Sequence, residues 1–170
     1  MIRTKPQAQP GPALRAALAE CAHHALILAA ARQDLAHTPY SADTLPGPEP
    51  EALRALDQAA YRFGKLQDTL ALRVLPAVLD WLEEPLPPTA TFPVKLQRLE
   101  RLGLIPSVEQ WRELRELRNQ LAHEYQDAPA LKAAALNRFV AGIDDLIALW
   151  QHLAAQLAQA GVALPAEDSS

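Results

Sequence analysis

The chain has 170 residues, a formal net charge of −4 and one cysteine. This length can bury a core without covalent staples, so we expect one domain, and the lone cysteine excludes an internal disulfide framework and fits a reducing cytoplasm. No stretch approaches the roughly 20 apolar residues that a bilayer span needs, and we therefore expect a soluble, cytoplasmic protein without membrane contact. The negative charge argues weakly against a generic nucleic-acid binder, because such proteins are usually basic.

Alanine and leucine dominate the composition, whereas aromatic residues make up only 5% of it. Both residues lose little entropy in a helix, so this composition favours helices over sheets. Prolines and glycines divide the chain into segments whose apolar residues recur with helical spacing. The sequence therefore predicts an all-α fold, an antiparallel helical bundle of four long helices plus a short one.

In chain order, the pattern predicts a flexible arm (1–12), a helix (12–37), a loop (38–50), a long helix (51–83), a loop (85–91), a short helix (92–102), a helix (107–125), a helix (127–160) and a flexible tail (161–170). Residues 13–160 form the single bundle domain. Pro76 should kink or break the long helix. Gly103 and Gly161 suit the left-handed position after a helix, and Ser107 with Gln110 forms a capping box at a helix start.

The segment RNQLAHEY (118–125) carries the most informative chemistry of the chain. Arg118 can hold a phosphate by a charge-assisted bidentate contact, and His123 can take or give a proton near neutral pH. Asn119 and His123 are four residues apart and share a helix face, as do Arg118 and Tyr125, which are seven apart. These side chains are the minimum equipment for metal-free cleavage of RNA.

Helix geometry separates the two groups that this chemistry needs. Arg118 and His123 lie about 140° apart on an ideal helix. They converge only through the long arginine side chain, a loosened helix end or a second protomer, and a twofold axis beside this helix would place two such sets around one cleft. Spacing alone is weak evidence, because Arg32 and His37 share it without the flanking asparagine and tyrosine.

A purely structural interpretation of the same segment stays open. Arg118 would pair with an acid such as Glu116 or Glu109 in a surface ion pair of little energetic value. His123 would be a polar surface residue, and Tyr125 would seal the helix end. The specificity of the four residues as a set favours a functional role.

RNQLAHEY resembles the Arg-x4-His-x-Tyr signature of HEPN domains, in particular the HepT-type toxins of HEPN–MNT toxin–antitoxin pairs of type VII. The helical layout, with the motif late on the penultimate long helix, and the segment 61–79 are also similar to that family. The resemblance implies a HEPN-like bundle, a homodimer and a metal-independent endoribonuclease that needs no cofactor. Arg118 would neutralise the scissile phosphate, and Asn119 would position the phosphate or the histidine. His123 would act as general base on the ribose 2′-hydroxyl or as general acid on the leaving oxygen, giving a 2′,3′-cyclic phosphate and a 5′-hydroxyl.

The resemblance also implies regulation at Tyr125. In that family the matching tyrosine is modified with AMP by the partner nucleotidyltransferase, an MNT-type antitoxin, which would add bulk and negative charge beside Arg118. The expected partners are therefore RNA, with tRNA as one candidate, and this nucleotidyltransferase. The alternative is a non-catalytic HEPN-like subunit that binds a nucleotide or a partner nucleotidyltransferase, which the acidic net charge and the angle between Arg118 and His123 favour.

Locally placed basic residues are the candidates for holding RNA, although a solvated helix face is the alternative for each of them. Ten of the sixteen Lys and Arg residues lie between Arg54 and Arg118, against nine acids. We therefore expect contacts to a few phosphates instead of non-specific coating. The predicted RNA-binding residues are Arg112, Arg115 and Lys65, with Arg62 and Arg73 as outer contacts.

No metal site is expected. His23 and His24 adjoin Cys21, but adjacent helical side chains point about 100° apart and no set of further ligands is evident. Cys21 lies on an apolar stripe and is expected in the core. Lys65 and Asp68, three residues apart, either support the cleft or form a simple helix ion pair.

Overall fold

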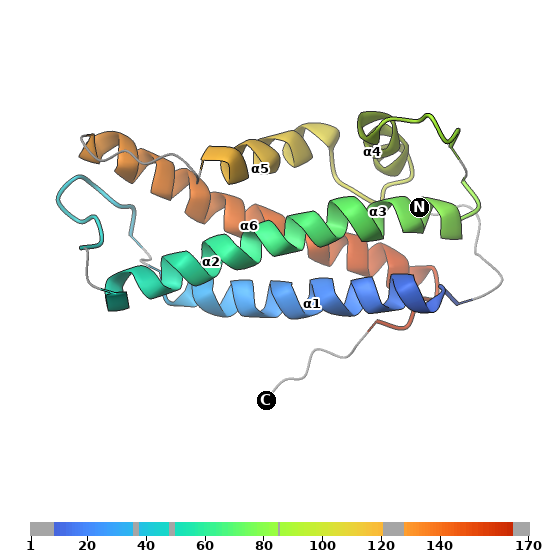
Figure 1. Cartoon of the computed structure of the whole chain (residues 1–170), viewed down its shortest axis with the longest axis horizontal. Helices are drawn as coiled ribbons and strands as arrows, with labels where there is room; N and C mark the ends of the chain where they lie inside the picture. The colour runs from blue at the N-terminus through green and yellow to red at the C-terminus, as the bar shows by residue number, and fades with distance from the viewer. Residues whose placement is uncertain (1–8, 36–37, 48–49, 85, 121–127, 165–170) are drawn as a thin grey trace.

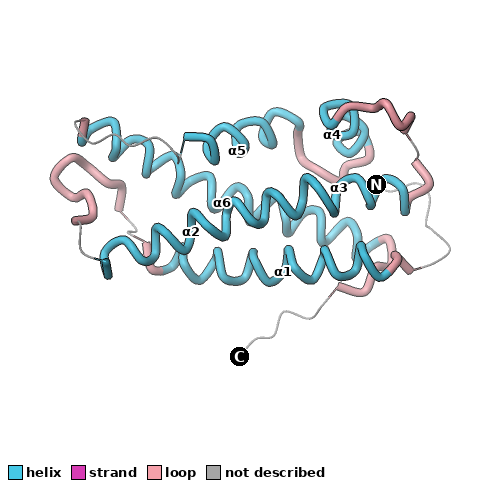
Figure 2. Tube along the Cα trace, in the orientation of Figure 1, coloured by secondary structure: helices cyan, strands magenta, loops and turns pink. Residues whose placement is uncertain are grey.

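The computed structural model describes residues 9–35, 38–47, 50–84, 86–120 and 128–164. Every regular element in these ranges is a helix, which confirms the predicted all-α class (Figure 2). The elements are α1 (Pro12–Gln33), α2 (Pro50–Thr69), the π-helix η1 (Leu70–Val74), α3 (Leu75–Trp81), α4 (Phe92–Arg101), α5 (Val108–Gln120) and α6 (Pro129–Gln159).

Helices α1, α2 and α6 form the body of the molecule, and α4 and α5 lie along one side of it (Figure 1). α1 packs along α2 and also contacts α6, while α5 contacts α2, α4 and α6. α1 and α2 run antiparallel, because Glu20 contacts Thr69 whereas His24, one turn later, contacts the earlier residue Arg62. α5 therefore contacts both α2, which precedes it in the chain, and α6, which follows it.

The core follows the apolar spacing of the sequence. The buried positions of α1 recur every three or four residues, as expected of a helix with one face against its neighbours. Phe63 of α2 and Phe139 of α6 meet edge to face at the centre, with ring centroids 5.4 Å apart. Cys21 is fully buried, as predicted.

The long second helix changes its geometry just before Pro76. The N–H of Leu75 bonds to the carbonyl of Leu70, five residues back instead of four, so residues 70–74 form a π-turn. Proline has no N–H, and in an α-helix its ring clashes with the carbonyl four residues earlier. A wider turn relieves that clash, and α3 follows directly. The kink or break predicted at Pro76 is thus a π-helical turn.

Two predicted helix ends, at Gly103 and Gly161, are confirmed, whereas α1 ends at Gln33, before the predicted end at residue 37. Gly103 and Gly161 have φ values of 73° and 96°, the left-handed conformation that favours glycine after a helix. Residues in the predicted flexible arm (1–12) and in the predicted flexible tail (161–170) also contact the rest of the structure. Gln9 donates from Nε2 to the carbonyl oxygen of Gly161 (2.7 Å), and Val162, placed in the predicted tail, is buried in the core.

α1 is the one helix in the described part of the chain that is long and apolar enough to cross a membrane, by length and composition only. The prediction that no stretch approaches this size was therefore wrong for α1. Core helices of soluble proteins pass the same test, and here the buried face of α1 packs against α2 and α6.

Candidate functional site

The start of α5 is fixed by side-chain caps. Ser107 Oγ accepts a hydrogen bond from the N–H of Gln110 (2.9 Å), which confirms half of the predicted capping box. The reciprocal bond is not made, because the buried Oε1 of Gln110 has no partner among the described residues. Instead, Glu100 Oε1 accepts from the N–H of Val108 (3.1 Å). Two caps therefore anchor α5 at the end opposite the motif.

The first two motif residues, Arg118 and Asn119, lie on the last described turn of α5. Arg118 is half-buried, whereas Asn119 is exposed. His123 and Tyr125 lie outside the described residues. The structure therefore describes only the Arg118 and Asn119 end of the motif.

Arg118 lies against α2. Its Nη2 donates to Oδ2 of Asp68 at 2.8 Å, and its Nε is 3.6 Å from the point where a side chain at Gly64 would begin. A Cβ at Gly64 would therefore be in ordinary van der Waals contact with the guanidinium. The side chains of Arg118 and Asp68 are 33% and 38% exposed. Since a guanidinium has five N–H donors, this one keeps donors for a further ligand.

The structural alternative for Arg118 named the wrong acids. Glu109 pairs with Arg112 (3.4 Å), and Glu116 accepts from Gln120 (3.3 Å), so neither binds Arg118. Its partner is instead Asp68, fifty positions earlier. The pair therefore joins two helices and fixes how α2 and α5 face one another.

Lys65, a predicted RNA contact, is exposed on α2. Its Nζ lies 5.6 Å from the ring centre of Tyr61, a cation–π distance. Among the described residues no ion pair joins Lys65 to Asp68, so the predicted helix ion pair is not formed. Lys65 therefore remains exposed to solvent.

A groove of about 700 Å³ lies between α5, α4 and the η1–α3 segment. Its lining contains three basic side chains, Lys95, Arg112 and Arg115, and one carboxylate, Glu116. The remaining lining is mainly apolar and includes Leu72, Pro76, Phe92, Pro93, Leu96 and Trp111. We call this the basic groove. Two of the three predicted RNA-binding residues, Arg112 and Arg115, line it.

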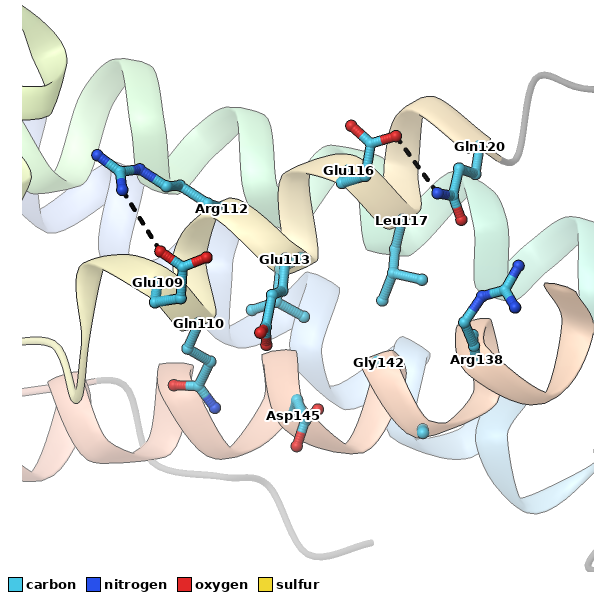
Figure 3. Close-up of a pocket in the computed structure, with 12 residues that line it drawn as sticks. Glu109, Gln110, Arg112, Glu113, Glu116, Leu117, Gln120, Arg138, Gly142 and Asp145 are labelled. Carbon is cyan, nitrogen blue, oxygen red and sulfur yellow. Dashed lines mark hydrogen bonds and ion pairs between the residues drawn. The ribbon is translucent and has the colours of Figure 1, made fainter. Parts of the chain in front are cut away.

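A second groove, of about 600 Å³, lies between α5 and α6 (Figure 3). Four carboxylates line it against two arginines, so we call it the acidic groove. Leu117 packs directly onto Gly142 at the helix contact, where a Cβ would come within 2.3 Å of Leu117 Cδ1. The charged lining residues are Glu109, Glu113, Glu116, Asp145, Arg112 and Arg138. The two sides of α5 therefore carry opposite charge balances, and a polyanion fits the basic side.

Arg118 and the basic groove belong to the same side of α5. Arg115 lines the groove and precedes Arg118 by three residues, and Leu72 lines it and follows Asp68 by four. Residues three or four apart are neighbours on a helix surface. About one turn of each helix therefore separates the groove from the pair of Arg118 and Asp68.

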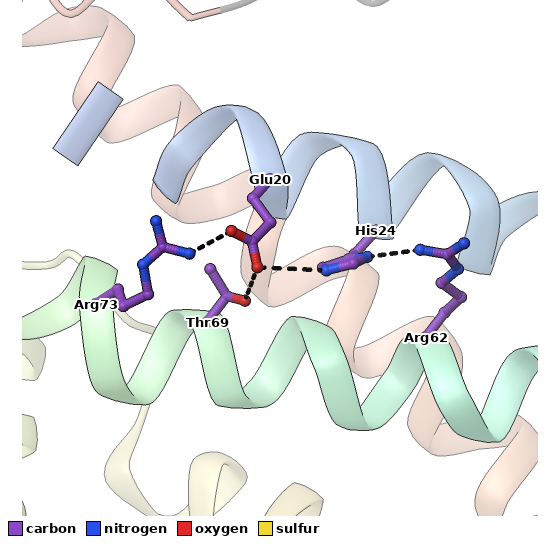
Figure 4. A network of polar contacts seen from close by, with 5 residues as sticks. All are labelled: Glu20, His24, Arg62, Thr69 and Arg73. Atoms are coloured by element: carbon purple, nitrogen blue, oxygen red, sulfur yellow. Dashed lines mark hydrogen bonds and ion pairs between the residues drawn. The ribbon is translucent and has the colours of Figure 1, made fainter. Parts of the chain in front are cut away.

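A separate polar network joins α1 to α2 (Figure 4). Glu20 accepts from the hydroxyl of Thr69 (3.0 Å) and from the guanidinium of Arg73. His24 Nδ1 lies 3.0 Å from Arg62 Nη1, and its Nε2 lies 3.6 Å from Glu20. Burial, helped by the charge of Arg62, lowers the pKa of His24, and the hydrogen bond from Thr69, with Arg73, lowers the pKa of Glu20. Arg62 and Arg73, predicted as outer RNA contacts, instead hold α1 against α2.

Sequence reasoning allowed Asp68 a supporting role at the cleft but did not identify Arg118 as its partner, because the two residues lie fifty positions apart. The basic residue of α4 in the groove, Lys95, had no local signal at all.

The arrangement can bind an anion, because Arg118 is oriented, partly exposed and about one turn from a basic groove. Within the described residues no group of three or more His, Cys, Asp and Glu side chains could hold a metal ion. Burial raises the pKa of the Cys21 thiol to about 12, which makes it a poor nucleophile.

Comparison with protein-family models, curated proteins and solved structures gave no match to this chain.

Proposed function

We propose that this protein is a metal-independent endoribonuclease with a HEPN-like antiparallel bundle that acts as a homodimer. The observation that carries the proposal is Arg118, the first residue of the Arg-Asn-x3-His-x-Tyr segment. It is held by Asp68, partly exposed and placed about one turn from a groove lined with cations. A guanidinium in that state is suited to one phosphate of a larger anion.

In the proposed reaction, Arg118 binds the scissile phosphate and stabilises the charge that builds on its oxygens. His123 takes the proton of the ribose 2′-hydroxyl, and the 2′-oxygen attacks phosphorus. The bond to the 5′-oxygen breaks, and that oxygen receives a proton, for which a twofold dimer supplies a second His123. Asn119, four residues before His123 in the chain, positions the phosphate or the imidazole. The products are a 2′,3′-cyclic phosphate and a 5′-hydroxyl.

We further propose that the chain is the toxin of a toxin–antitoxin pair whose antitoxin is an MNT-type nucleotidyltransferase. Transfer of AMP to the hydroxyl of Tyr125 would place a phosphodiester negative charge seven residues along the chain from Arg118. That charge would compete with the RNA phosphate. A neighbouring gene encoding a small nucleotidyltransferase with a Gly-Ser-x10-Asp-x-Asp pattern would support this pairing.

The test is cleavage of total RNA by the purified, unmodified protein in EDTA. We expect cleavage in EDTA, its loss in His123→Ala and Arg118→Ala, and 5′-hydroxyl ends that polynucleotide kinase can label. His37→Ala is the matched control, because His37 also follows an arginine by five residues but lacks the flanking asparagine and tyrosine. General acid–base catalysis typically contributes ~10²–10⁴-fold, so the loss in His123→Ala should be of that order.

The second candidate function is a non-catalytic subunit that binds a nucleotide or a nucleotidyltransferase. One observation favours it: Asp68 already neutralises part of the charge that Arg118 would offer to a transition state. Absence of cleavage by a folded, unmodified dimer across tRNA, rRNA and mRNA would overturn the ribonuclease proposal and leave this one.

A further inference from the structure

We infer that the basic groove binds single-stranded RNA, holding the nucleotides that flank the phosphate at Arg118. The inference rests on the proposed function for the identity of the anion. It extends that function by naming the strand type and the surface that receives it.

The charges of the basic groove are largely unpaired. Arg115 makes no ion pair with any described residue, and neither does Lys95. Arg112 has one partner, Glu109, at 3.4 Å, but both side chains are more than half exposed (59% and 70%). Such a surface pair is worth little, so a phosphate can displace it at small cost. Three cations against one carboxylate are an unusual excess in a chain with net charge −4.

The floor of the groove offers the apolar surface that bases need. Leu72, in the π-turn, is 75% exposed, the highest value among the exposed large hydrophobic side chains. Phe92 is partly exposed and packs edge to face on Trp111, with ring centroids 5.9 Å apart. Proteins that bind single strands without sequence preference combine cations for the backbone with aromatic and apolar surface for the bases. A volume of about 700 Å³ lies within the usual range of small-ligand sites, enough for part of a strand.

Double-stranded RNA fits this surface poorly. Its bases are stacked inside the helix and cannot reach an apolar floor, whereas unstacked bases in single-stranded regions can. The combination of exposed Leu72, Phe92 and cations that are weakly paired or unpaired among the described residues therefore favours a single strand over a duplex.

The experiment measures binding without cleavage. A dye-labelled single-stranded RNA oligonucleotide is titrated with the full chain carrying His123→Ala, in EDTA, over a range of salt concentrations. Arg115→Gln and Lys95→Gln are made in this background. The matched control is Arg138→Gln, because Arg138 is also exposed but lines the acidic groove.

For a single strand, log K falls with log[salt] at about 0.7 per phosphate contact. Each groove variant should therefore lower the salt slope by about 0.7, which at 0.1 M salt corresponds to roughly fivefold weaker binding. Phe92→Leu should weaken binding with the slope unchanged. Arg138→Gln should change neither quantity.

Three results would overturn the inference. The first is equal weakening by Arg115→Gln and Arg138→Gln, which would indicate diffuse attraction. The second is no binding at all. The third is a dimer that Leu72→Asp dissociates while RNA binding stays intact, which would make the groove a contact between copies. The proposed function can fail separately from this inference. A wild-type chain that binds RNA through Arg115 and Lys95 but cleaves none would support the inference about the groove and contradict the ribonuclease proposal.

Discussion

Replacing Asp68 by alanine separates the structural role of its ion pair from a role in catalysis. Both side chains are about one-third exposed, so the pair with Arg118 resembles a surface salt bridge worth about 0.2–1 kcal/mol. Alanine also has the higher helix propensity. Asp57→Ala, which removes an exposed acid on the same helix that forms no ion pair with any described residue, carries the same propensity gain and serves as control. The difference between the two variants should be at most ~1 kcal/mol, or about 2–4 °C in thermal midpoint for a chain of this size.

The effect on catalysis should be larger than the effect on stability. Without Asp68, the guanidinium of Arg118 samples several rotamers, and fixing it on the phosphate costs part of the roughly 2 kcal/mol of side-chain entropy that arginine carries. A cost of about 1.4 kcal/mol in the transition state lowers kcat about tenfold. The carboxylate also no longer competes with the phosphate, so KM should not rise. A fall in kcat without a rise in KM is the signature of a positioning residue.

Both quantities can be measured on the same preparations. Initial rates on a fluorogenic single-stranded RNA in EDTA give kcat and KM, and far-ultraviolet circular dichroism gives the unfolding curve. Asp68→Glu keeps the carboxylate and should retain more activity than Asp68→Ala. Unchanged kcat in Asp68→Ala, or a loss of stability well above 1 kcal/mol relative to Asp57→Ala, would refute the reasoning.

Three further predictions concern stability and reactivity. Burial lowers the pKa of His24, so below about pH 6.5 the unfolded chain binds a proton that the folded chain does not, and the free energy of unfolding should decrease as the pH is lowered. His24→Gln should flatten this dependence in thermal melts, whereas His23→Gln, at an exposed position, should not. The Cys21 thiol, with a pKa of about 12, should resist iodoacetamide at pH 8 until the protein is unfolded in guanidinium, and labelling of the folded chain would contradict its burial. Gly64→Ala should raise the free energy of unfolding by about 0.5–1 kcal/mol, because its Cβ meets only Arg118 at 3.6 Å, whereas Gly161→Ala at φ 96° should lower it by about 1–2 kcal/mol; equal signs in denaturant titrations would contradict the geometry.

The fold was predictable where the signals are local. The helical spacing of the apolar residues predicts the helices. Gly103 and Gly161 follow their helices in the left-handed conformation that the sequence predicts. Pro76 showed that the long helix is disturbed but not how. A kink, a break and a π-turn can each accommodate a proline, which has no N–H. Which of the three forms depends on how the flanking segments pack, and a local sequence pattern does not contain that information.

The candidate site was predictable only in part, for the same reason. The motif identified Arg118, but its partner lies fifty positions away on α2 and depends on the register between two helices. Local reasoning offered Glu109 and Glu116 instead, since these acids are near in sequence. Lys95 likewise enters the basic groove only because α4 packs across the end of α5.

The charge distribution around α5 reconciles an acidic chain with the proposed RNA substrate. The basic groove has three cations and one carboxylate, the acidic groove has four carboxylates and two arginines, and Arg112 and Glu116 line both. A helix is about 10–12 Å across, close to the Debye length of about 10 Å at 0.1 M salt, so a carboxylate that lines only the acidic groove, such as Asp145 of α6, acts only weakly on a phosphate in the basic groove. The net charge of −4 is a sum over the whole chain, whereas a bound phosphate responds mainly to the charges close to it. What decides whether an anion binds is therefore the local excess beside Arg118, and that excess is positive.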